Sequence, residues 1–532
     1  MENADIALTL ESYAALLDLA GAGYYTIRAY RRAAELVRET RAPVAELVRA
    51  GRVRELRGIG PGIERRLQEL VATGRIAELE ELEREVEPQL VALARLLGLS
   101  AQRLVAIGKE LDLRTADELR AAAAAGRLRE VRGIGPETER KILAGLGRER
   151  PRRRRGLLAN RARALAEAVA AELDAVVAGE VRRRRDLVFE LSVVTTAADA
   201  LERLESSPIL VAVVEREPSR AVAVTVEGIP VEVVVAPPAS LGTALLRATG
   251  SAEYVASLGP LPEAATEEEV YARLGLPWVP PELREAPVDA VPRLVELADV
   301  RGDLHAHTTW SDGKASVLEM AEAARDRGYE YLAICDHTPN VRVVPGLDAD
   351  ALRRQAEEIA AVNEAVAPFR VLRGTECDIR RDGALDLPDD VLAELDWVQL
   401  SLHAGQREDE ERLTRKVVEA MRHPAVRCLS HPKGRIINHR PPNALRLDAV
   451  IEVALETGVA VETNGLPDRL DLRDEEVRQC VEAGVPVVCS TDAHSVRGLG
   501  NMELAVATAR RGWATAGDVL NTRPLAEILR RR

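Results

Sequence analysis

The stretch Arg301-Gly-Asp-Leu-His-Ala-His307 decides the fold of the C-terminal part of this chain. It reads as a short β-strand that ends in two histidines one residue apart, and residues i and i+2 of a strand point to the same face. Near the end of the chain, Asp492-Ala-His494 repeats the arrangement. The two pairs predict two strands whose ends bring four metal-binding side chains to one site.

Between these two pairs, apolar runs alternate with amphipathic stretches. The strand-like runs are 302–307, 331–335, 370–374, 397–402, 426–430, 459–463 and 485–490. The helical stretches are 316–328, 349–366, 408–421, 446–456 and 474–483. Strands that alternate with helices in this way predict a parallel α/β barrel of the (βα)7 type over residues 300–532. Barrels of this kind carry their chemistry at the carboxyl ends of the strands.

Nine metal-binding side chains stand at or just beyond these predicted strand ends. They are His305, His307, Asp312, His337, Glu376, His403, His431, Asp492 and His494. Nine ligands are too many for one ion, and imidazole with carboxylate but no thiolate suits Mn²⁺, Zn²⁺ or iron. Two or three close ions can clamp the attacking and leaving oxygens of a phosphoryl displacement. The sequence therefore predicts a catalytic centre of two or three divalent metals, and leaves His423 and His439 as structural histidines.

The N-terminal 150 residues read as all-helical and contain an internal repeat. Gly58-Ile-Gly60 and Gly133-Ile-Gly135 occupy equivalent places in the near-identical segments 54–65 and 129–140. A Gly-x-Gly turn that enters a helix lets backbone N–H groups approach a phosphate closely. We therefore predict helix-hairpin-helix contacts with the DNA backbone, independent of sequence; for each copy alone, a simple helix–helix turn is the alternative. The predicted contact glycines are Gly58, Gly60, Gly62, Gly133 and Gly135.

The 532 residues are 46% hydrophobic and 30% charged, with a net charge of −13, as in ordinary globular proteins. No apolar run is long enough to span a membrane and no secretory signal opens the chain, so we expect a cytoplasmic protein without a membrane partner. Five scattered cysteines indicate neither a disulfide framework nor a zinc finger. The acidic total excludes a uniformly basic surface that coats DNA, but basic runs occur at 152–155 and 182–185.

Residues 302–494 resemble the PHP (polymerase and histidinol phosphatase) family through the nine residues given above. The resemblance implies a trinuclear metal cluster that hydrolyses phosphoesters, with the nine residues as its ligands and Glu376 as the bridging carboxylate. Lys433 and Arg435 follow His431 and are predicted to contact a phosphate, with two solvated loop charges as the alternative.

The whole chain is similar to the bacterial family X DNA polymerases. The similarity rests on the Gly-x-Gly hairpins, Thr249-Gly-Ser251, Tyr271-Ala-Arg-Leu-Gly-Leu-Pro-Trp278 and the opening motif. It implies a multidomain protein with an all-α helix-hairpin-helix head, an α+β nucleotidyltransferase-like palm and the C-terminal barrel. The expected domains are 1–85 (DNA-binding helices), 86–150 (fingers-like hairpin domain), 156–250 (palm), 251–295 (shortened thumb or linker) and 300–532 (PHP barrel).

The palm departs from the pattern of that family. The family expects Gly-Ser followed by Asp-x-Asp, but this chain has Glu180, then Glu190 and Ser192, and Glu232 replaces the third aspartate. A polymerase holds Mg²⁺ with short carboxylates. Ser192 supplies no charge, and Glu180 places a negative charge where a triphosphate would lie. We therefore predict a degenerate palm, which serves as a scaffold or binds DNA weakly through Arg182 and Arg183, with Mg²⁺ relevant only to residual polymerisation.

The leading hypothesis is a monomeric DNA-repair enzyme whose barrel is a metal-dependent 3'→5' exonuclease. Its DNA substrates would be gaps, nicks, 3' ends or abasic sites. Three alternatives stay open. The first is a gap-filling polymerase that tolerates glutamate ligands and also has the exonuclease. The second is a small-molecule phosphatase of the histidinol-phosphate type. The third is a non-catalytic DNA-binding repair scaffold.

Overall fold

The computed structural model describes residues 3–19, 22–40, 43–56, 58–79, 88–99, 101–147, 156–225, 228–341, 345–438 and 440–530. They form two compact units. The first holds the described parts of 1–154, 166–178 and 189–248, and the second those of 155–165, 179–188 and 249–532. The basic run 152–155 and His439 lie outside the described residues. No helix among the described residues is long and apolar enough to cross a membrane.

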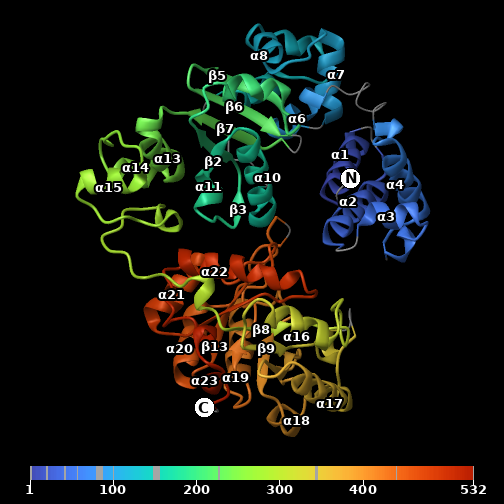
Figure 1. The fold of residues 1–532 in the computed structure, drawn as a ribbon, viewed down its shortest axis with the longest axis vertical. Helices are drawn as coiled ribbons and strands as arrows, with labels where there is room; N and C mark the ends of the chain where they lie inside the picture. Colours follow the sequence, from blue (N-terminus) through green and yellow to red (C-terminus); the bar gives the residue numbers. More distant parts are fainter. Residues whose placement is uncertain are drawn as a thin grey trace. The chain divides into compact units, whose positions relative to one another are not determined.

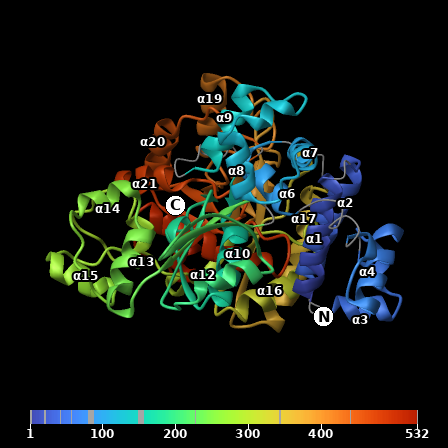
Figure 2. The ribbon, with the colours of Figure 1, turned by 90° about the horizontal axis from the view of Figure 1, so that it is seen from above.

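The head is helical, as expected, and forms two groups in the first unit (Figures 1 and 2). The first group is α1 (Asn3–Leu19), α2 (Tyr24–Glu39), α3 (Val44–Arg49), η1 (Val53–Glu55) and α4 (Pro61–Thr73). The second is α6 (Pro88–Leu97), α7 (Ala101–Leu111), α8 (Ala116–Ala124), η2 (Arg127–Glu130) and α9 (Pro136–Gly145). The core of the first group uses only residues from Ile6 to Leu79, so this group buries its apolar side chains by itself.

A five-stranded mixed sheet, the predicted α+β palm, completes the first unit. Its strands lie in the order β2 (Ala175–Ala178), β4 (Leu191–Thr195), β7 (Pro230–Val235), β6 (Arg220–Thr225) and β5 (Leu210–Glu217). Only β4 and β7 run parallel. The second helical group packs on β5 and β6 through Val214, Val222 and Val224. This group and the sheet therefore share one core.

The barrel in the second unit has the predicted seven parallel strands. They are β8 (Gly302–Ala306), β9 (Tyr331–Ile334), β10 (Arg370–Asp378), β11 (Trp397–Ser401), β12 (Cys428–Leu429), β13 (Ala460–Asn464) and β14 (Val487–Ser490). The sheet runs from β8 to β14 in chain order, and a bridge between Ala306 and Ala493 nearly closes it. Apart from Arg370 and Arg373 on β10, the strands are buried along their length, which explains why they read as apolar runs.

Five helices around the barrel match the predicted stretches to within a few residues: α16 (Val317–Arg325), α17 (Ala349–Ala365), α19 (Glu410–Met421), α20 (Leu447–Thr457) and α21 (Asp474–Ala483). The prediction did not include α18 (Asp389–Ala393), α22 (Met502–Arg511) and α23 (Leu525–Ile528). Two strands differ from the prediction: β12 covers only part of the run 426–430, and β10 continues past residue 374. Its extension from Thr375 to Asp378 pairs with β11 after β9 has ended. Glu376 therefore lies within its strand.

The remaining elements are short, apart from α10. They are β1 (Leu157–Leu158), α10 (Ala159–Glu172), α11 (Gly179–Arg182), β3 (Leu187–Val188), α12 (Ala200–Arg203), η3 (Leu204–Ser206), η4 (Pro238–Ser240), α13 (Leu241–Thr249), α14 (Ala252–Ser257), α15 (Glu267–Leu274), η5 (Pro281–Leu283), η6 (Leu297–Asp299), η7 (Pro339–Val341), η8 (Gly498–Asn501) and η9 (Leu520–Thr522). In the second unit, β1 and β3 pair antiparallel. A buried ion pair between Arg284 and Glu267 holds the segment that follows α15.

Candidate metal centre

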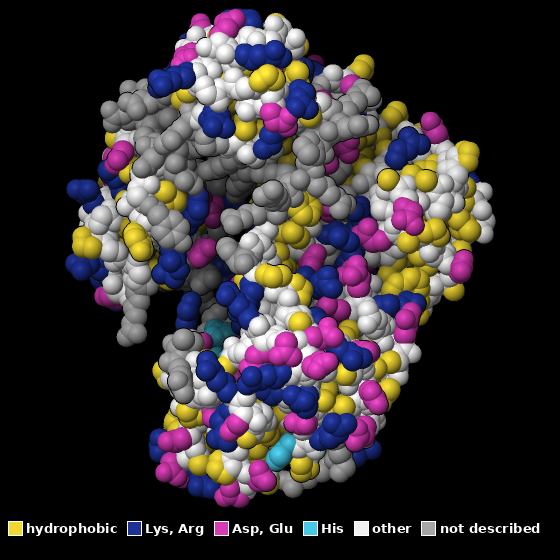
Figure 3. Space-filling model, turned by 180° about the vertical axis from the view of Figure 1, so that it is seen from behind, with side chains coloured by type: hydrophobic (Ala, Val, Ile, Leu, Met, Phe, Trp, Pro, Cys, Tyr) yellow, Lys and Arg dark blue, Asp and Glu magenta, His cyan; other side chains and the backbone are white. Residues whose placement is uncertain are grey.

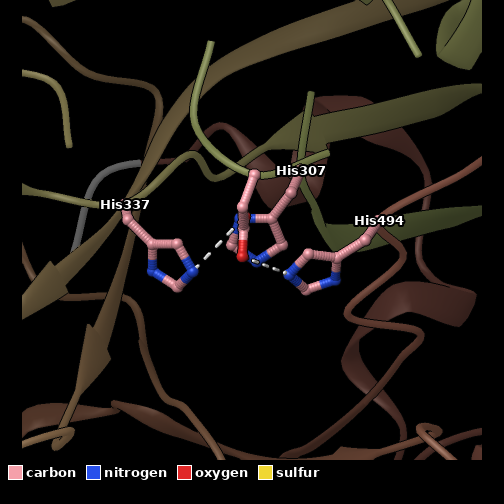
Figure 4. Close-up of side chains that lie close together, drawn as sticks. His307, His337 and His494 are labelled. Carbon is pink, nitrogen blue, oxygen red and sulfur yellow. Dashed lines mark ion pairs between the residues drawn. The ribbon is translucent and has the colours of Figure 1, made fainter. Parts of the chain in front are cut away.

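Four of the nine predicted residues form one candidate metal group at the rim of the barrel. The side chains of His307, Asp312, His337 and His494 offer ligand atoms that all lie within 4.8 Å of one another. The Asp312 carboxylate is 3.6 Å from Nε2 of His337 and 3.2 Å from Nε2 of His494. Figure 4 shows the three imidazoles gathered around this carboxylate. The arrangement can hold a divalent cation through three nitrogens and one oxygen.

Two further groups share members with the first. His305 and His307 converge with Asp492, and His337 converges with Glu376 and His403. His307 and His337 therefore each belong to two groups, so the three groups form one continuous centre.

Glu376 lies in the middle of this centre, on β10. One of its oxygens is 2.8 Å from Nε2 of His431, and the other is 2.9 Å from Nδ1 of His337. The rings of His305, His307 and His403 also lie within 3.6 Å of the carboxylate. The structure thus brings all nine predicted residues together, and the bridging role of Glu376 stays a prediction.

Buried hydrogen bonds lock the two strand ends that meet where the barrel closes. The Asp303 carboxylate on β8 accepts hydrogen bonds from the backbone N–H and hydroxyl of Thr491, which directly precedes Asp492. It also accepts the backbone N–H of His305. Asp492 itself has a φ of 51°, a left-handed conformation that non-glycine residues adopt at a cost of about 1–3 kcal/mol. The fold therefore sustains local strain to aim this carboxylate into the centre.

Sequence reasoning missed Glu462, which lies on β13 and is fully buried. It is 2.7 Å from Nδ1 of His305 and accepts the backbone N–H of His431 at 2.6 Å. A carboxylate beside one nitrogen of a ligating histidine fixes its tautomer and ring orientation. Gln399 on β11 donates to the same carboxylate at 2.9 Å. The available signal was a charged residue inside the apolar run 459–463, because charges are rarely fully buried unless paired.

Two further buried carboxylates fix loops that carry ligands. Asp336 accepts hydrogen bonds from the hydroxyls of Thr308 and Ser311 and so fixes the loop that bears Asp312. Asp378 accepts the backbone N–H of His403 at 3.0 Å and lies 3.4 Å from its Nδ1. Neither residue was predicted, because their partners come from loops whose course the sequence does not show.

Burial and neighbouring charged groups shift the pKa values of the imidazoles in the centre strongly. Burial alone would lower the pKa of His337, but Glu376 and Asp312 outweigh it and raise the pKa to about 10. Burial likewise opposes the positive form of His305, yet Glu462, Asp492 and Glu376 raise its pKa well above the usual range. His307 lies among other imidazoles, so burial and its neighbours lower its pKa to about 4. The buried carboxylates therefore favour positive charge at His305 and His337.

The donor set fits divalent metals. Nδ1 of His307 and Nδ1 of His431 are buried and make no hydrogen bond with the described residues. Buried polar atoms without a partner are rare in native proteins and call for an explanation such as an ion. Neutral imidazoles and carboxylates together are ligands for Zn²⁺, Mn²⁺ or iron.

Metal binding is expected to release protons. The pKa values of His305, His337 and His494 are raised in the metal-free centre, and a metal binds only the neutral ring. The apparent affinity for Mn²⁺ should therefore rise with pH up to about pH 10, the value to which the pKa of His337 is raised. Calorimetric titration in buffers of different ionisation enthalpy measures the protons released per ion. Binding with no proton release would contradict the assigned ligands.

The two predicted phosphate contacts point elsewhere. The Lys433 ammonium donates to the carbonyl of Leu445, and the Arg435 guanidinium pairs with Asp186 at 2.8 Å. The structure therefore supports neither the phosphate contact nor the solvated alternative for these two residues. Arg469, which the sequence analysis did not select, lies beside the centre, with Nε 3.9 Å from Oδ2 of Asp492.

Arg182 and Arg183 also have partners within the protein. Arg182 forms an ion pair with Glu267 at 2.8 Å, and Arg183 pairs with Glu285 at 3.0 Å and donates to the carbonyl of Thr249. Arg183 is 9% exposed. These contacts favour a structural role over the predicted contact with DNA.

The two Gly-x-Gly turns have matching conformations. Gly58 and Gly133 have φ values of 116° and 88°, and Gly60 and Gly135 are the residues that precede α4 and α9. A Cβ on Gly60, Gly135 or Gly62 would meet no atom within 4 Å, so the backbone there is open to a ligand. On the face shown in Figure 3, positive and negative side chains are interspersed, which fits local contacts with DNA and excludes a uniformly basic coat on that face.

Two of the four palm positions, Ser192 and Glu232, come together, and neither is an aspartate. Ser192 on β4 is the register partner of Glu232 on β7, and its hydroxyl lies 3.5 Å from the Glu232 carboxylate. The other Glu232 oxygen is 2.6 Å from Nε of Arg220. Arg220 also pairs with Glu215 at 2.9 Å. A cation of the protein therefore already occupies one side of the carboxylate that would face Mg²⁺.

Three family models match the chain. A helix-hairpin-helix domain matches residues 1–76, a DNA polymerase beta thumb matches 256–285 and a PHP domain matches 303–454. The thumb match falls inside the segment 251–295 that was expected to be a shortened thumb.

Similar proteins fall into two kinds. The "DNA polymerase/3'-5' exonuclease PolX" of Bacillus subtilis is 33% identical over 99% of both chains. A "Probable phosphatase" of Acetivibrio thermocellus is 30% identical over 36% of this chain and 78% of its own length. Another, from Photobacterium profundum, is 29% identical over 38% of this chain and 81% of its own length. Only the first kind accounts for the full length of the chain.

Proposed function

Because the chain belongs to the PolX family of DNA polymerase/3'-5' exonucleases, we propose that it is a DNA-repair enzyme whose barrel removes nucleotides from DNA 3' ends. The convergence of eight metal-binding side chains in three linked groups, with His431 2.8 Å from Glu376, carries the proposal. The palm also supports the proposal, because Ser192 and the ion pair between Arg220 and Glu232 stand where a polymerase would hold Mg²⁺. Monomeric state and a cytoplasmic location stay predictions.

The barrel would hold two or three divalent ions, with Mn²⁺ and Zn²⁺ as the leading candidates and iron as a third. His307, Asp312, His337 and His494 would hold one, His305, His307 and Asp492 a second, and Glu376, His337, His403 and His431 a third. When bound, such ions lower the pKa of a water molecule and neutralise charge on a phosphate.

Residues of the chain supply orientation and charge around this chemistry. Glu462 holds His305 through Nδ1, which leaves Nε2 directed at Asp492 and Glu376. Arg469 lies beside Asp492 with 22% of its side chain exposed, so it can donate to a phosphate oxygen that enters the centre. A guanidinium there would position the phosphodiester but would not transfer a proton.

A matched set of substrates tests the function. Gapped duplexes labelled at either end, single strands and abasic duplexes would be incubated with the Mn²⁺-loaded chain. We expect the 3' label to be released as mononucleotides before the strand shortens from its 5' end. His307→Ala serves as the inactive reference. Loss of the 5' label first would contradict the proposed polarity.

A small-molecule phosphatase is the second candidate, because proteins named probable phosphatase match more than a third of the chain. Histidinol phosphate and a simple phosphodiester would be compared in the same assay. Turnover of the monoester without any digestion of DNA would favour this alternative.

The first helical group is expected to strengthen DNA binding without serving the chemistry. It has a core of its own, so deletion of residues 1–85 should leave the remaining fold intact, whereas deletion of 1–150 would expose Val214, Val222 and Val224. The truncated chain should bind gapped DNA more weakly. The logarithm of its affinity should also fall less steeply with the logarithm of the salt concentration. The slope should be smaller by about 0.9 for each phosphate that the deleted group neutralises in the full chain.

Hydrolysis of a small phosphodiester by the truncated chain should stay at the level of the full chain. DNA binding with unchanged affinity and unchanged salt slope would show that the first hairpin does not contact DNA.

A further inference from the structure

The turn that follows α11 makes an ion pair with a loop of the metal centre. Oδ2 of Asp186 lies 2.8 Å from Nη1 of Arg435, and the Arg435 side chain is 9% exposed. The other terminal nitrogen of Arg435 donates to the carbonyl of Leu470 at 2.6 Å. All three residues belong to the same compact unit. Arg435 therefore connects the Asp186 turn to two loops that follow strands of the barrel.

Both of these loops carry groups of the centre. Arg435 lies four residues after His431, and Leu470 directly follows Arg469. Between His431 and Arg435 the backbone is tightly turned, since His431 and Gly434 have φ values of 22° and 53° and the N–H of Gly434 donates to the carbonyl of His431. A side chain at Gly434 would collide with Gln406. A displacement of Arg435 would therefore be passed on to His431.

Two other contacts hold the same part of the chain. The amide of Asn438 donates to the carbonyl of Gly156 at 2.9 Å. Arg511, at the end of α22, donates to the carbonyl of Arg183 at 2.9 Å. Asp186 is thus fixed in a segment tied to the barrel at several points, which allows it to act as a support for Arg435.

We propose that Asp186 is a positioning residue of the metal centre, which acts through Arg435 on the loops of His431 and Arg469. The proposal rests on the proposed function, since it concerns the same centre. It also gives the Arg182–Asp186 turn of the degenerate palm a role: it supports the nuclease. Asp186 touches none of the nine ligands, so its effect is on the geometry of the loops.

The test compares Asp186→Asn with Asp199→Asn in the full chain. The first removes a charge that faces a 9% exposed guanidinium, and the second removes one from a palm carboxylate that is 62% exposed. Mn²⁺ titration followed by calorimetry is the primary readout, and hydrolysis of a simple phosphodiester is the second. Asp186→Asn should weaken at least one Mn²⁺ site about tenfold, as is typical of residues that support a metal ligand indirectly. Asp199→Asn should match the original chain.

A double-mutant cycle identifies the route. If Asp186 acts through Arg435, Asp186→Asn combined with Arg435→Gln should bind Mn²⁺ no more weakly than Arg435→Gln alone. Asn438→Asp provides an independent variant, because it replaces the donor to Gly156 by an acceptor while keeping the size of the side chain. It should weaken the same Mn²⁺ site even if Asp186→Asn lowers the melting temperature.

The positioning role is overturned if Mn²⁺ affinity and stoichiometry are unchanged in both Asp186→Asn and Asn438→Asp. The route through Arg435 is overturned if the losses of affinity in the double-mutant cycle are additive. Failure of the proposed function looks different. In that case the unaltered chain itself would bind less than one Mn²⁺ and hydrolyse no phosphodiester.

Discussion

His307→Ala is expected to lower the rate of DNA hydrolysis by on the order of 10³-fold, about 4 kcal/mol of transition-state stabilisation. The reason is the place of this side chain in two of the three metal groups. Its Nε2 lies 3.1 Å from Asp492 and 3.2 Å from Nε2 of His305. Removal of one shared ligand therefore impairs two ion sites at once.

The fold should tolerate this change. Nδ1 of His307 makes no hydrogen bond with the described residues. Burial and the neighbouring imidazoles lower the pKa of His307 to about 4. Alanine thus removes an imidazole that contributes little to the stability of the metal-free protein. The melting temperature of the metal-free variant should stay close to that of the original chain, while bound Mn²⁺ decreases.

His423→Ala is the matched control for this prediction. His423 follows α19, pairs with Asp389 at 3.4 Å and belongs to none of the three groups. It should leave both metal content and hydrolysis unchanged. Full activity of His307→Ala at saturating Mn²⁺ would show that the hydrolytic centre lies elsewhere.

The barrel could be predicted closely because its strands are buried on both faces. Such strands appear as apolar runs, and runs such as 331–335 and 397–402 ended within a residue of β9 and β11. The metal-binding residues could then be predicted as well, since the carboxyl ends of parallel strands meet at one rim. β10 was the exception, because its extension depends on pairing with β11 and not on its own sequence.

What the sequence could not show is where long side chains point. Arg435 looked like a phosphate contact because it follows His431, but its partner Asp186 lies 249 residues away in the chain. Arg182 and Arg183 looked like a DNA-binding run, yet acidic partners far along the chain neutralise them. The role of Glu462 could not be predicted either, because it depends on a contact with His305 on another strand.

Templated nucleotide addition is expected to be undetectable. The barrel would degrade a newly extended primer, so the measurement needs the His307→Ala chain on a gapped template with Mg²⁺ or Mn²⁺. In that background we expect no more primer extension than in a control without metal. The residual alternative is a polymerase that tolerates glutamate ligands, and gap filling that is lost on Glu232→Ala would establish it.

Nucleotide addition is expected to be absent because of the two strands that would hold Mg²⁺. Ser192 and Glu232 are register partners on β4 and β7, so only one of the two carries a charge. Although partial burial works against its charged form, Arg220 has a raised pKa because Glu232 and Glu215 stabilise it, so it remains a cation at this carboxylate. Mg²⁺ would have to displace that cation and still find oxygen ligands for an octahedral site.

Two variants separate these obstacles. Ser192→Asp restores one carboxylate but leaves Arg220 in place, so it should not restore incorporation by itself. Ser192→Asp combined with Arg220→Ala removes the competing cation and should bind Mg²⁺ more tightly than either single variant. Incorporation by Ser192→Asp alone would show that the missing charge is the whole obstacle and that the ion pair between Arg220 and Glu232 is readily displaced.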